Sequence, residues 1–368
     1  MNQPDCQSIQ FNGSDFTSFI NFVKSMNSKD KSKYSRLVLL HVENDKLVCR
    51  AIDDNSNYIE YYVELFHTDN EITEYISVAI SDILALVKCS SNIKFTIRKC
   101  FNQYEFNVIG DGWLPFNVID VDITKYNIKG NTSTLGEINA SELYDAISSV
   151  LSYTQEYTYA KDKYITFKAD KMFVTSRLSG VMTKGTFVEM VLHRDDAARL
   201  RLLLKDCDEL KISSIKSEIE QLCFESKRFK FIINCSDIDT SDNSYNKAID
   251  NYVTVNCDEL YKLVLFAEEY SASKHLVGLT IKDGKLIASV KNTLGANHVS
   301  VIESKPIGSV SSTHEAVAKA KNILRSLKIF QDKHIREINI YISDELLVDQ
   351  NSIIVFDDNT QAIINIIQ

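Results

Sequence analysis

The sequence predicts an α+β protein built from repeated units of helices packed on antiparallel strands. A ten-residue opening occurs three times, as FNGSDFTSFI at 11–20, INASELYDAI at 138–147 and VNCDELYKLV at 255–264. Each opening leads into an apolar stripe of helical period and then into strand pairs with tight turns. A second helix and further alternating strands follow in every unit. Each unit is therefore a duplicated strand-helix-strands module with two helices on antiparallel sheets.

The three openings align residue by residue. They place three asparagines together at spacings of 127 and 117 residues, namely Asn12, Asn139 and Asn256. Two positions later comes a Ser or Asp, a type favoured as a helix N-cap, at Ser14, Ser141 and Asp258. We expect a helix to begin at each of these polar residues. The second helices are expected to begin near Ser81, Arg194 and Thr313.

Three domains are expected, with boundaries at 1–130, 131–246 and 247–368. The boundaries follow from polar, turn-rich connectors at 127–136 and 236–247. A chain of 368 residues suits two or three domains of common size. Because it contains only 3 Pro and 11 Gly, long disordered linkers are not expected.

The composition indicates an intracellular, cytoplasmic protein. The start MNQPDCQSIQ has no secretory leader, and no apolar run reaches the roughly 18 residues of a membrane span. The 8 cysteines include no CxxC pair, so we expect small core residues rather than zinc ligands or disulfides. The net charge of −9 argues against a protein that binds nucleic acid over its whole surface.

Positive charge is concentrated in two of the expected helices. The helix at 192–205 carries Arg194, Arg199, Arg201 and Lys205. The helix at 315–330 carries Lys319, Lys321, Arg325 and Lys328. A short basic face on one helix is usually just its solvent side. Two such faces at the same repeat position in an acidic chain favour a shared anionic partner.

No catalytic signature is present. The chain has no GxxxxGK[ST], GxGxxG, GxSxG or HExxH motif, and its 7 histidines are dispersed. Asp53 and Asp54 are interpreted as turn carboxylates. We expect a protein that is not an enzyme and needs no cofactor or metal.

The repeat layout resembles that of the DNA sliding clamps, in particular the bacterial three-domain beta clamp. The resemblance rests on the three doubled modules, the total length and the basic helices on an acidic chain. Its best local pieces are LVLLHVENDKLVCRAID at 37–53 and DGWLPFNVID at 111–120. It implies that two chains join head to tail into a ring, with helices lining the hole and duplex DNA passing through it.

The resemblance also implies which residues meet DNA and partners. The DNA-facing candidates are Lys24, Lys88, Arg194, Arg199, Arg201, Lys205, Lys262, Lys321, Arg325 and Lys328. A DNA polymerase and a clamp loader are expected to dock through short peptides between the second and third domains. The candidates for that pocket are Ile165, Thr175, Leu178, Ile364, Ile366 and Ile367. Ile364 and Ile366 equally fit the core side of a terminal strand. The Tyr-rich stretch at 152–164 is a second candidate for DNA contact.

Two functional hypotheses remain open from the sequence. The first is a ring that encircles DNA for processive synthesis in a bacterial or phage-infected cell. The alternative is a clamp-like monomeric processivity factor or a protein-binding scaffold that does not encircle DNA. The repeats fit both, because folding needs them in either case.

Overall fold

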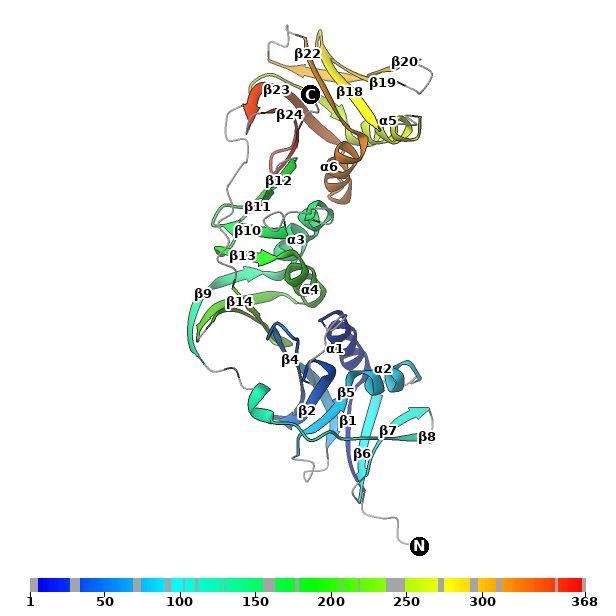
Figure 1. Cartoon of the computed structure of the whole chain (residues 1–368), viewed down its shortest axis with the longest axis vertical. Helices are drawn as coiled ribbons and strands as arrows, with labels where there is room; N and C mark the ends of the chain where they lie inside the picture. Colours follow the sequence, from blue (N-terminus) through cyan, green and yellow to red (C-terminus); the bar gives the residue numbers. More distant parts are fainter. Residues whose placement is uncertain are drawn as a thin grey trace. The chain divides into compact units, whose positions relative to one another are not determined.

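The structure of the chain is a computed structural model (Figure 1). It describes residues 6–26, 34–68, 74–101, 103–109, 112–126, 128, 130–154, 163–175, 179–205, 207–217, 219–235, 249–270, 275–291, 297–308, 313–347 and 350–365, except 90–93. The chain divides into two compact units, one of Met1–Ser141 with Ala198–Cys235 and one of Glu142–Ala197 with Ser236–Gln368.

The first unit contains helices α1 (Gly13–Met26) and α2 (Ile80–Cys89) and two short 3-10 turns, Tyr34–Arg36 and Ile123–Tyr126. Its strands are β1 (Cys6–Asn12), β2 (Leu37–Glu43), β3 (Lys46–Ile52), β4 (Tyr58–Thr68), β5 (Ile76–Ala79), β6 (Lys94–Cys100), β7 (Gln103–Ile109), β8 (Gly112–Phe116), β9 (Asn131–Asn139), β14 (Glu209–Lys216), β15 (Glu220–Glu225) and β16 (Phe229–Asn234). They form one antiparallel sheet with the order β8-β7-β6-β1-β4-β16-β15-β14-β9, and β2, β3 and β5 branch from β4.

The second unit contains helices α5 (Cys257–Tyr270) and α6 (Ala320–Asp332). Its strands are β10 (Tyr164–Lys168), β11 (Lys171–Thr175), β12 (Ser179–Lys184), β13 (Met190–His193), β17 (Tyr252–Asn256), β18 (Leu276–Lys282), β19 (Lys285–Lys291), β20 (Asn297–Ile302), β21 (Ser304–Ile307), β22 (His314–Lys319), β23 (Glu337–Leu347), β24 (Gln350–Phe356) and β25 (Thr360–Asn365). One sheet has the order β13-β10-β11-β12-β25-β24-β23-β17-β21, and a smaller one has the order β20-β19-β18-β22. Helices α3 (Ala140–Thr154) and α4 (Arg194–Leu204) each begin in one unit and end in the other.

Strand pairing crosses both of the domain boundaries that the sequence suggests. Strand β16 pairs with β4, with Phe229 opposite Tyr61. Strand β12 pairs with β25, with Ser179 opposite Ile364. The expected second domain therefore shares one sheet with each of its neighbours. Backbone hydrogen bonds thus join segments that the three-domain division separates. The division itself stays a prediction.

The helices pack on their sheets through apolar faces, as the sequence period predicts. In the first unit, α1 contacts α2, and the rings of Phe11 and Phe16 are buried 5.0 Å apart. In the second unit, α5 contacts α6, and Leu260, Leu327 and Phe330 are fully buried. Burial of each such side chain stabilises the fold by about 1.5–3 kcal/mol.

The helix openings are capped by asparagine rather than by the Ser or Asp that the sequence suggested. Asn12 Oδ1 accepts hydrogen bonds from the backbone N–H groups of Ser14 and Asp15, at 2.9 and 3.1 Å. Asn256 Oδ1 does the same for Asp258 and Glu259, at 3.0 and 3.1 Å, and Asn139 Oδ1 accepts from Ser141 N–H at 2.9 Å. The amide oxygen reaches the second and third helical N–H groups, which a helix leaves unpaired.

The last helix starts later than predicted. The sequence places its beginning near Thr313, but residues His314–Lys319 form strand β22 and α6 begins at Ala320. Ala316 and Ala318 are buried while Glu315, Val317 and Lys319 are exposed, which is the alternation of a strand. Pairing of β22 with β18 over six residues therefore outweighs the helix propensity of its alanines.

One pair of cysteines departs from the expectation of scattered thiols. Cys6 and Cys100 form a disulfide, although 94 positions separate them in the sequence. They lie opposite each other in the β1–β6 pair, with Cα atoms 4.5 Å apart. Cys49, Cys223 and Cys257 are buried outside any disulfide, as expected of small core residues.

Candidate nucleic-acid and partner interface

Helix α6 separates its charged and apolar sides cleanly. Lys321, Arg325 and Lys328 are spaced four and three residues apart, so they lie along one face. Lys321 and Lys328 are exposed and Arg325 is half-buried, while the opposite face carries the buried Ile323, Leu324, Leu327 and Phe330. Lys328 Nζ lies 3.0 Å from Asp332 Oδ1, and this hydrogen bond raises the pKa of Lys328. The lysine is therefore fully charged at neutral pH.

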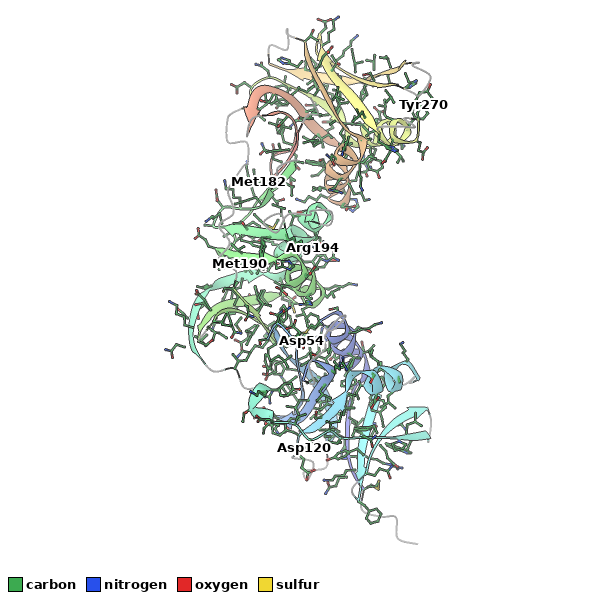
Figure 2. The ribbon with its side chains drawn as sticks, viewed as in Figure 1. Asp54, Asp120, Met182, Met190, Arg194 and Tyr270 are labelled. Atoms are coloured by element: carbon green, nitrogen blue, oxygen red, sulfur yellow. A yellow bond between two sulfur atoms is a disulfide. The ribbon has the colours of Figure 1, made fainter. Side chains whose placement is uncertain are left out.

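The basic residues predicted on α4 occupy different environments. Arg194 is the first residue of the helix (Figure 2), and its Nε lies 3.6 Å from Asp195 Oδ1. Arg201 is half-buried, and Lys205 is exposed directly after the helix ends. These three side chains have solvent-accessible positions from which phosphate contacts are geometrically possible.

Arg199 lies in the interior of the first unit, against the expectation that it faces DNA. Its guanidinium lies 3.2 Å from Asp53 Oδ2 and donates a hydrogen bond to the Met26 carbonyl at 3.1 Å. Burial raises the pKa of Asp53, while hydrogen bonds from Asn57 and the charge of Arg199 lower it. Asp53 also accepts from the backbone N–H of Asn55, as a turn carboxylate should. We therefore assign Arg199 a structural role within the first unit in place of the predicted DNA contact.

The remaining predicted basic residues lie on three other helices. Lys24 and Lys88 are exposed in the last turns of α1 and α2, in the first unit. Lys262 is exposed on α5 of the second unit. Helix α3 has no basic residue in its last turn. Of the six helices in the described ranges, five therefore present at least one of the predicted basic side chains at a solvent-accessible position.

The first unit contains a groove of about 400 Å³ that the sequence did not reveal. Ser18 and Asn21 of α1 line one side, and Leu202 and Lys205 line another. Arg228, in the turn before β16, also lines the groove, and its Nη2 lies 2.6 Å from Asp15 Oδ1. Because Arg228 belongs to a strand turn, no helical charge pattern could have identified it. The groove is thus lined by two cations, one of which is already paired with a carboxylate.

Two of the residues predicted for a partner-peptide pocket lie in the core. Ile165 of β10 and Ile364 of β25 are fully buried, so the alternative that Ile364 belongs to the core is correct. Thr175 is the last residue of β11. Leu178, Ile366 and Ile367 lie outside the described residues. Ile165 and Ile364 are therefore corrected from pocket to core, because neither side chain has exposed surface.

The opposite face of the same sheet carries a small apolar cluster that the sequence did not identify. Ile354 and Ile363 form its buried centre, with Ile249, Tyr341 and Phe356 packed against them and partly exposed. Strand register extends this row from Tyr341 through Ile354, Ile363 and Gly180 to Thr175. The register thus places position 175 at the end of this row of strand pairs. We call the cluster of Ile249, Tyr341, Ile354, Phe356 and Ile363 the β25 apolar strip.

The tyrosine-rich stretch falls mostly outside the described residues. Tyr164, at the start of β10, is half-buried, and its ring lies 5.2 Å from that of His193 in an edge-on contact. Tyr157 and Tyr159 are not among the described residues, and Tyr153 lies in the last turn of α3. The ring of Tyr164 is thus engaged within its own sheet.

The described part of the chain shows neither a cluster of metal-ligand side chains nor a helix suited to spanning a membrane. There, no group of three or more His, Cys, Asp or Glu side chains could hold a metal ion. Among the same residues, no helix has both the length and the apolar character that a membrane span requires.

No protein family model and no curated protein matches the chain in sequence. Solved structures match it over nearly its whole length. The DNA polymerase III subunit beta of Pseudomonas aeruginosa has a TM-score of 0.79 at 14% identity, covering 98% of this chain and 100% of that one. The beta subunit of Streptococcus pyogenes has a TM-score of 0.79 at 13% identity, with coverages of 98% and 100%. The chain has the beta sliding-clamp fold.

The C. crescentus beta sliding clamp also matches, with a TM-score of 0.77 at 13% identity over 99% of this chain and 100% of that chain. The sliding-clamp resemblance and the α+β fold class predicted from the sequence are thereby confirmed. At these identities the likeness is one of fold. The charged and apolar surfaces described above therefore lie on a chain with the clamp fold.

Proposed function

We propose that this clamp-fold chain is a DNA sliding clamp, which closes as a homodimeric ring around duplex DNA and tethers a DNA polymerase for processive synthesis. The observation that carries the proposal is the full-length fold match to beta subunits of DNA polymerase III, at 98% of this chain and 100% of the matched chain. The proposed action is topological and includes no catalytic step, metal or cofactor. We place it in the cytoplasm of a bacterial or phage-infected cell.

One proposed ring-closing surface is the outer edge of β8. This strand ends the sheet order of the first unit, and β7 is its sole paired neighbour among the described strands. Leu114 lies opposite the buried Phe106, so it belongs to the core face, yet it is 43% exposed. An apolar side chain on the core face of an open edge strand favours a partner strand that completes the sheet.

The complementary surface that we propose lies at β20 and the end of α5. Strand β20 ends its sheet, and the neighbouring helix exposes Leu265, Phe266 and Tyr270 by 39%, 45% and 37%. The rings of Phe266 and Tyr270 stack 5.5 Å apart, and the His298 ring lies 5.1 Å from Phe266. Pairing of β8 in one copy with β20 in the next would bury these aromatics. Such a head-to-tail contact generates a ring when its rotation closes.

The proposed DNA path is lined by the solvent-accessible basic residues of the helices. These are Lys24, Lys88, Arg194, Arg201, Lys205, Lys262, Lys321, Arg325 and Lys328. Lys and Arg contacts to phosphate are sequence-independent and exchange rapidly, which permits sliding. A net charge of −9 for the chain repels DNA from the remaining surface.

We propose that partner peptides from a DNA polymerase and a clamp loader dock on the β25 apolar strip. The strip offers partly exposed Ile249, Tyr341 and Phe356 around a buried centre, and Thr175 lies at its end. Apolar peptide side chains anchor on such surfaces. In this proposal the residues of the strip take the place of Ile165 and Ile364 as peptide contacts, and Thr175 is kept as a candidate.

Native mass tests ring closure directly. We expect the wild-type chain, 41.9 kDa, to sediment as a dimer at micromolar concentration. Phe266→Asp should sediment as a single chain, because a charge would be buried in the proposed contact. Val317→Asp is the matched control, since Val317 is 38% exposed on β22 at the other edge of the same sheet. A wild-type monomer under these conditions would favour the alternative of a monomeric processivity factor or scaffold.

A further inference from the structure

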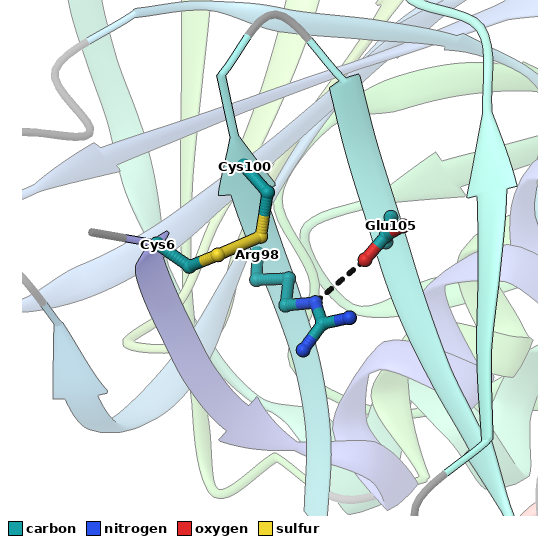
Figure 3. The surroundings of a disulfide bond; sticks show 4 residues. All are labelled: Cys6, Arg98, Cys100 and Glu105. Atoms are coloured by element: carbon teal, nitrogen blue, oxygen red, sulfur yellow. Dashed lines mark hydrogen bonds and ion pairs between the residues drawn. A yellow bond between two sulfur atoms is a disulfide. The ribbon is translucent and has the colours of Figure 1, made fainter. Parts of the chain in front are cut away.

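Four neighbouring strands of the first unit are linked across one face of their sheet. The strands are β1, β6, β7 and β8, which are consecutive in the sheet order. The Cys6–Cys100 disulfide joins β1 to β6 (Figure 3). Arg98 Nε lies 2.6 Å from Glu105 Oε2, which joins β6 to β7. The same guanidinium lies over the Trp113 ring at 3.8 Å, which joins β6 to β8.

These links share the face that points away from the core. Cys100 and Arg98 are two residues apart on β6, so their side chains leave the sheet on the same side. Phe95 and Ile97, which alternate with them, are buried on the core side with Phe106. We call the disulfide, the ion pair and the cation–π contact together the outer-face brace. The brace runs from β1 to β8, the edge strand proposed above for ring closure.

The disulfide is the one link of the brace that thiol chemistry can open. Cys6 and Cys100 are both half-buried at the ends of their strands, and strand pairing holds their Cα atoms 4.5 Å apart. One Cys thiolate attacks oxidised glutathione and releases one glutathione thiolate. The second Cys thiolate then attacks the mixed disulfide and releases another. Two protein thiols are oxidised and one glutathione disulfide is reduced to two thiols, so electrons and protons balance.

We propose that the Cys6–Cys100 pair is a thiol–disulfide switch that controls, through the outer-face brace, how firmly the β8 edge is held for ring closure. The inference rests on the proposed function. In the oxidised state β1 is fixed covalently to β6, and the Arg98 contacts carry that order to β7 and β8. In the reduced state this covalent link is absent, while the hydrogen bonds that pair β1 with β6 remain. The edge then samples more conformations before it pairs, and ordering it costs binding free energy.

The test uses the full chain in buffers dominated by oxidised or reduced glutathione. Iodoacetamide labelling followed by peptide mass spectrometry should leave Cys6 and Cys100 unlabelled in the oxidised buffer and label both in the reduced one. The midpoint of thermal unfolding of the first unit should fall by about 5–10 °C on reduction. Sedimentation equilibrium should give a dimer dissociation constant about three- to tenfold higher in the reduced buffer.

Two variants make the comparison specific. Cys6→Ser should behave as the reduced protein in both buffers. Cys235→Ser removes a half-buried cysteine that is outside the disulfide, and it should respond to the buffers as the wild type does.

The possible outcomes separate this inference from the proposed ring. Equal dissociation constants in both buffers, with labelling that confirms opening of the disulfide, would overturn the switch and leave the ring intact. Labelling of both thiols in the oxidised buffer would also overturn it. A wild-type monomer in both buffers would remove the ring, and the switch with it.

Discussion

At the scale of single residues, one side chain has the same task at three helix starts. Asn12, Asn139 and Asn256 each turn an amide oxygen toward the first helical N–H groups. Ser14 and Ser141, which the sequence suggested as caps, instead lie inside their helices as donors to those asparagines. The repeated opening is visible in the sequence. Which of its polar residues caps the helix, the asparagine or the residue two positions later, depends on where the helical backbone begins.

The capping role can be measured at the first helix. Asn12→Ala should lower the free energy of unfolding by about 1 kcal/mol, because two N–H groups at the start of α1 are deprived of their acceptor. Ser14→Ala, two positions away, should change it by a few tenths at most, roughly the effect of an ordinary surface substitution. Urea unfolding of both variants provides the comparison. A larger destabilisation for Ser14→Ala would restore the cap predicted from the sequence.

Arg199 illustrates what a charge pattern leaves undetermined. The sequence correctly places Arg199 on a helix with several basic residues, but its ion-pair partner, Asp53, lies 146 positions earlier in the chain. The exposed fraction of the Arg199 side chain is 15% and that of Asp53 is 1%. No periodic pattern in the sequence relates two residues so far apart. The interior ion pair of Arg199 could therefore be found only from the folded structure.

Removing this arginine should reveal a pH-dependent cost. Arg199→Gln leaves the Asp53 carboxylate buried without its cation, which should destabilise the unit by about 3–5 kcal/mol near neutral pH. The pKa of Asp53 is already raised by burial, and removal of Arg199 raises it further. A group with a raised pKa favours folding at low pH, and that stability is lost as pH rises through the folded-state pKa. The deficit should therefore shrink as the medium is acidified.

Urea unfolding of wild type and Arg199→Gln at a series of pH values between neutral and mildly acidic measures this effect. A deficit that stays constant with pH would show that Asp53 is not the group concerned. The salt dependence of DNA binding should be the same in both proteins, because the Arg199 guanidinium is engaged inside the unit. A reduced salt slope would return Arg199 to the DNA path.

At the scale of elements, α6 is the helix whose charge and burial agree most clearly with a DNA-facing role. Its predicted basic residues lie on one face, and the opposite face is buried. The carboxylate of Asp332 pairs with Lys328, and Lys321 and Arg325 add two further positive charges to this face. A helix of this kind can offer several phosphate contacts while its packing remains unchanged.

Substitution of Lys321, Arg325 and Lys328 by Ala together should weaken DNA retention. The slope of log binding constant against log salt should fall in magnitude by about 1 for each phosphate that the variant no longer neutralises. Lys282, Lys285 and Lys305 provide a matched control, since all three are exposed lysines on strands or turns of the same unit. Fluorescence anisotropy with duplex DNA at several salt concentrations measures both sets. Equal effects of the two triple variants would remove α6 from the DNA path.

Strand β25 presents adjacent isoleucines to opposite sides of its sheet. Ile364 is fully buried on one side, whereas Ile363 belongs with Ile354 to the buried centre of the apolar strip on the other. The sequence pattern does not distinguish core from pocket for Ile364, because alternation gives the period of a strand but not its direction. Which side chains of β25 face the core depends on how this strand pairs with its neighbours β12 and β24.

Two serine substitutions test this division of the strand. Ile364→Ser should lower the free energy of unfolding by about 3 kcal/mol or more, because it leaves a cavity and buries a hydroxyl. Ile249→Ser, at the partly exposed rim of the strip, should leave unfolding nearly unchanged and reduce affinity for a polymerase-derived peptide severalfold. Calorimetry and peptide titration report the two quantities. If Ile249→Ser binds peptide as the wild type does, the strip is not the docking surface.

The order of elements was predicted more accurately than their pairing. The helices of the described ranges begin within a few residues of the expected starts except α6, whose expected first residues form β22. Helix period and turn chemistry are local, so they can be read along the chain. Pairings such as β16 with β4 and β12 with β25 depend on distant segments and left no local signal. The Cys6–Cys100 disulfide escaped prediction for the same reason.

At the scale of the whole molecule, the proposed mode of action draws on the fold and on the charge distribution together. The clamp fold extends over 98% of the chain, and two of its strand edges carry exposed apolar side chains. Solvent-accessible cations occur on the helices of a chain whose net charge is −9. A ring needs attraction for phosphate at its hole alone, since closure prevents escape.

The central proposal, topological tethering, is tested by cutting the DNA. The protein is incubated at high concentration with nicked circular duplex, isolated with it by gel filtration, and the circle is then linearised with a restriction enzyme. We expect the protein to stay with the intact circle and to dissociate within minutes of cutting, unless the new ends are blocked by bulky bound proteins. Retention on unblocked linear DNA equal to that on the circle would contradict the ring.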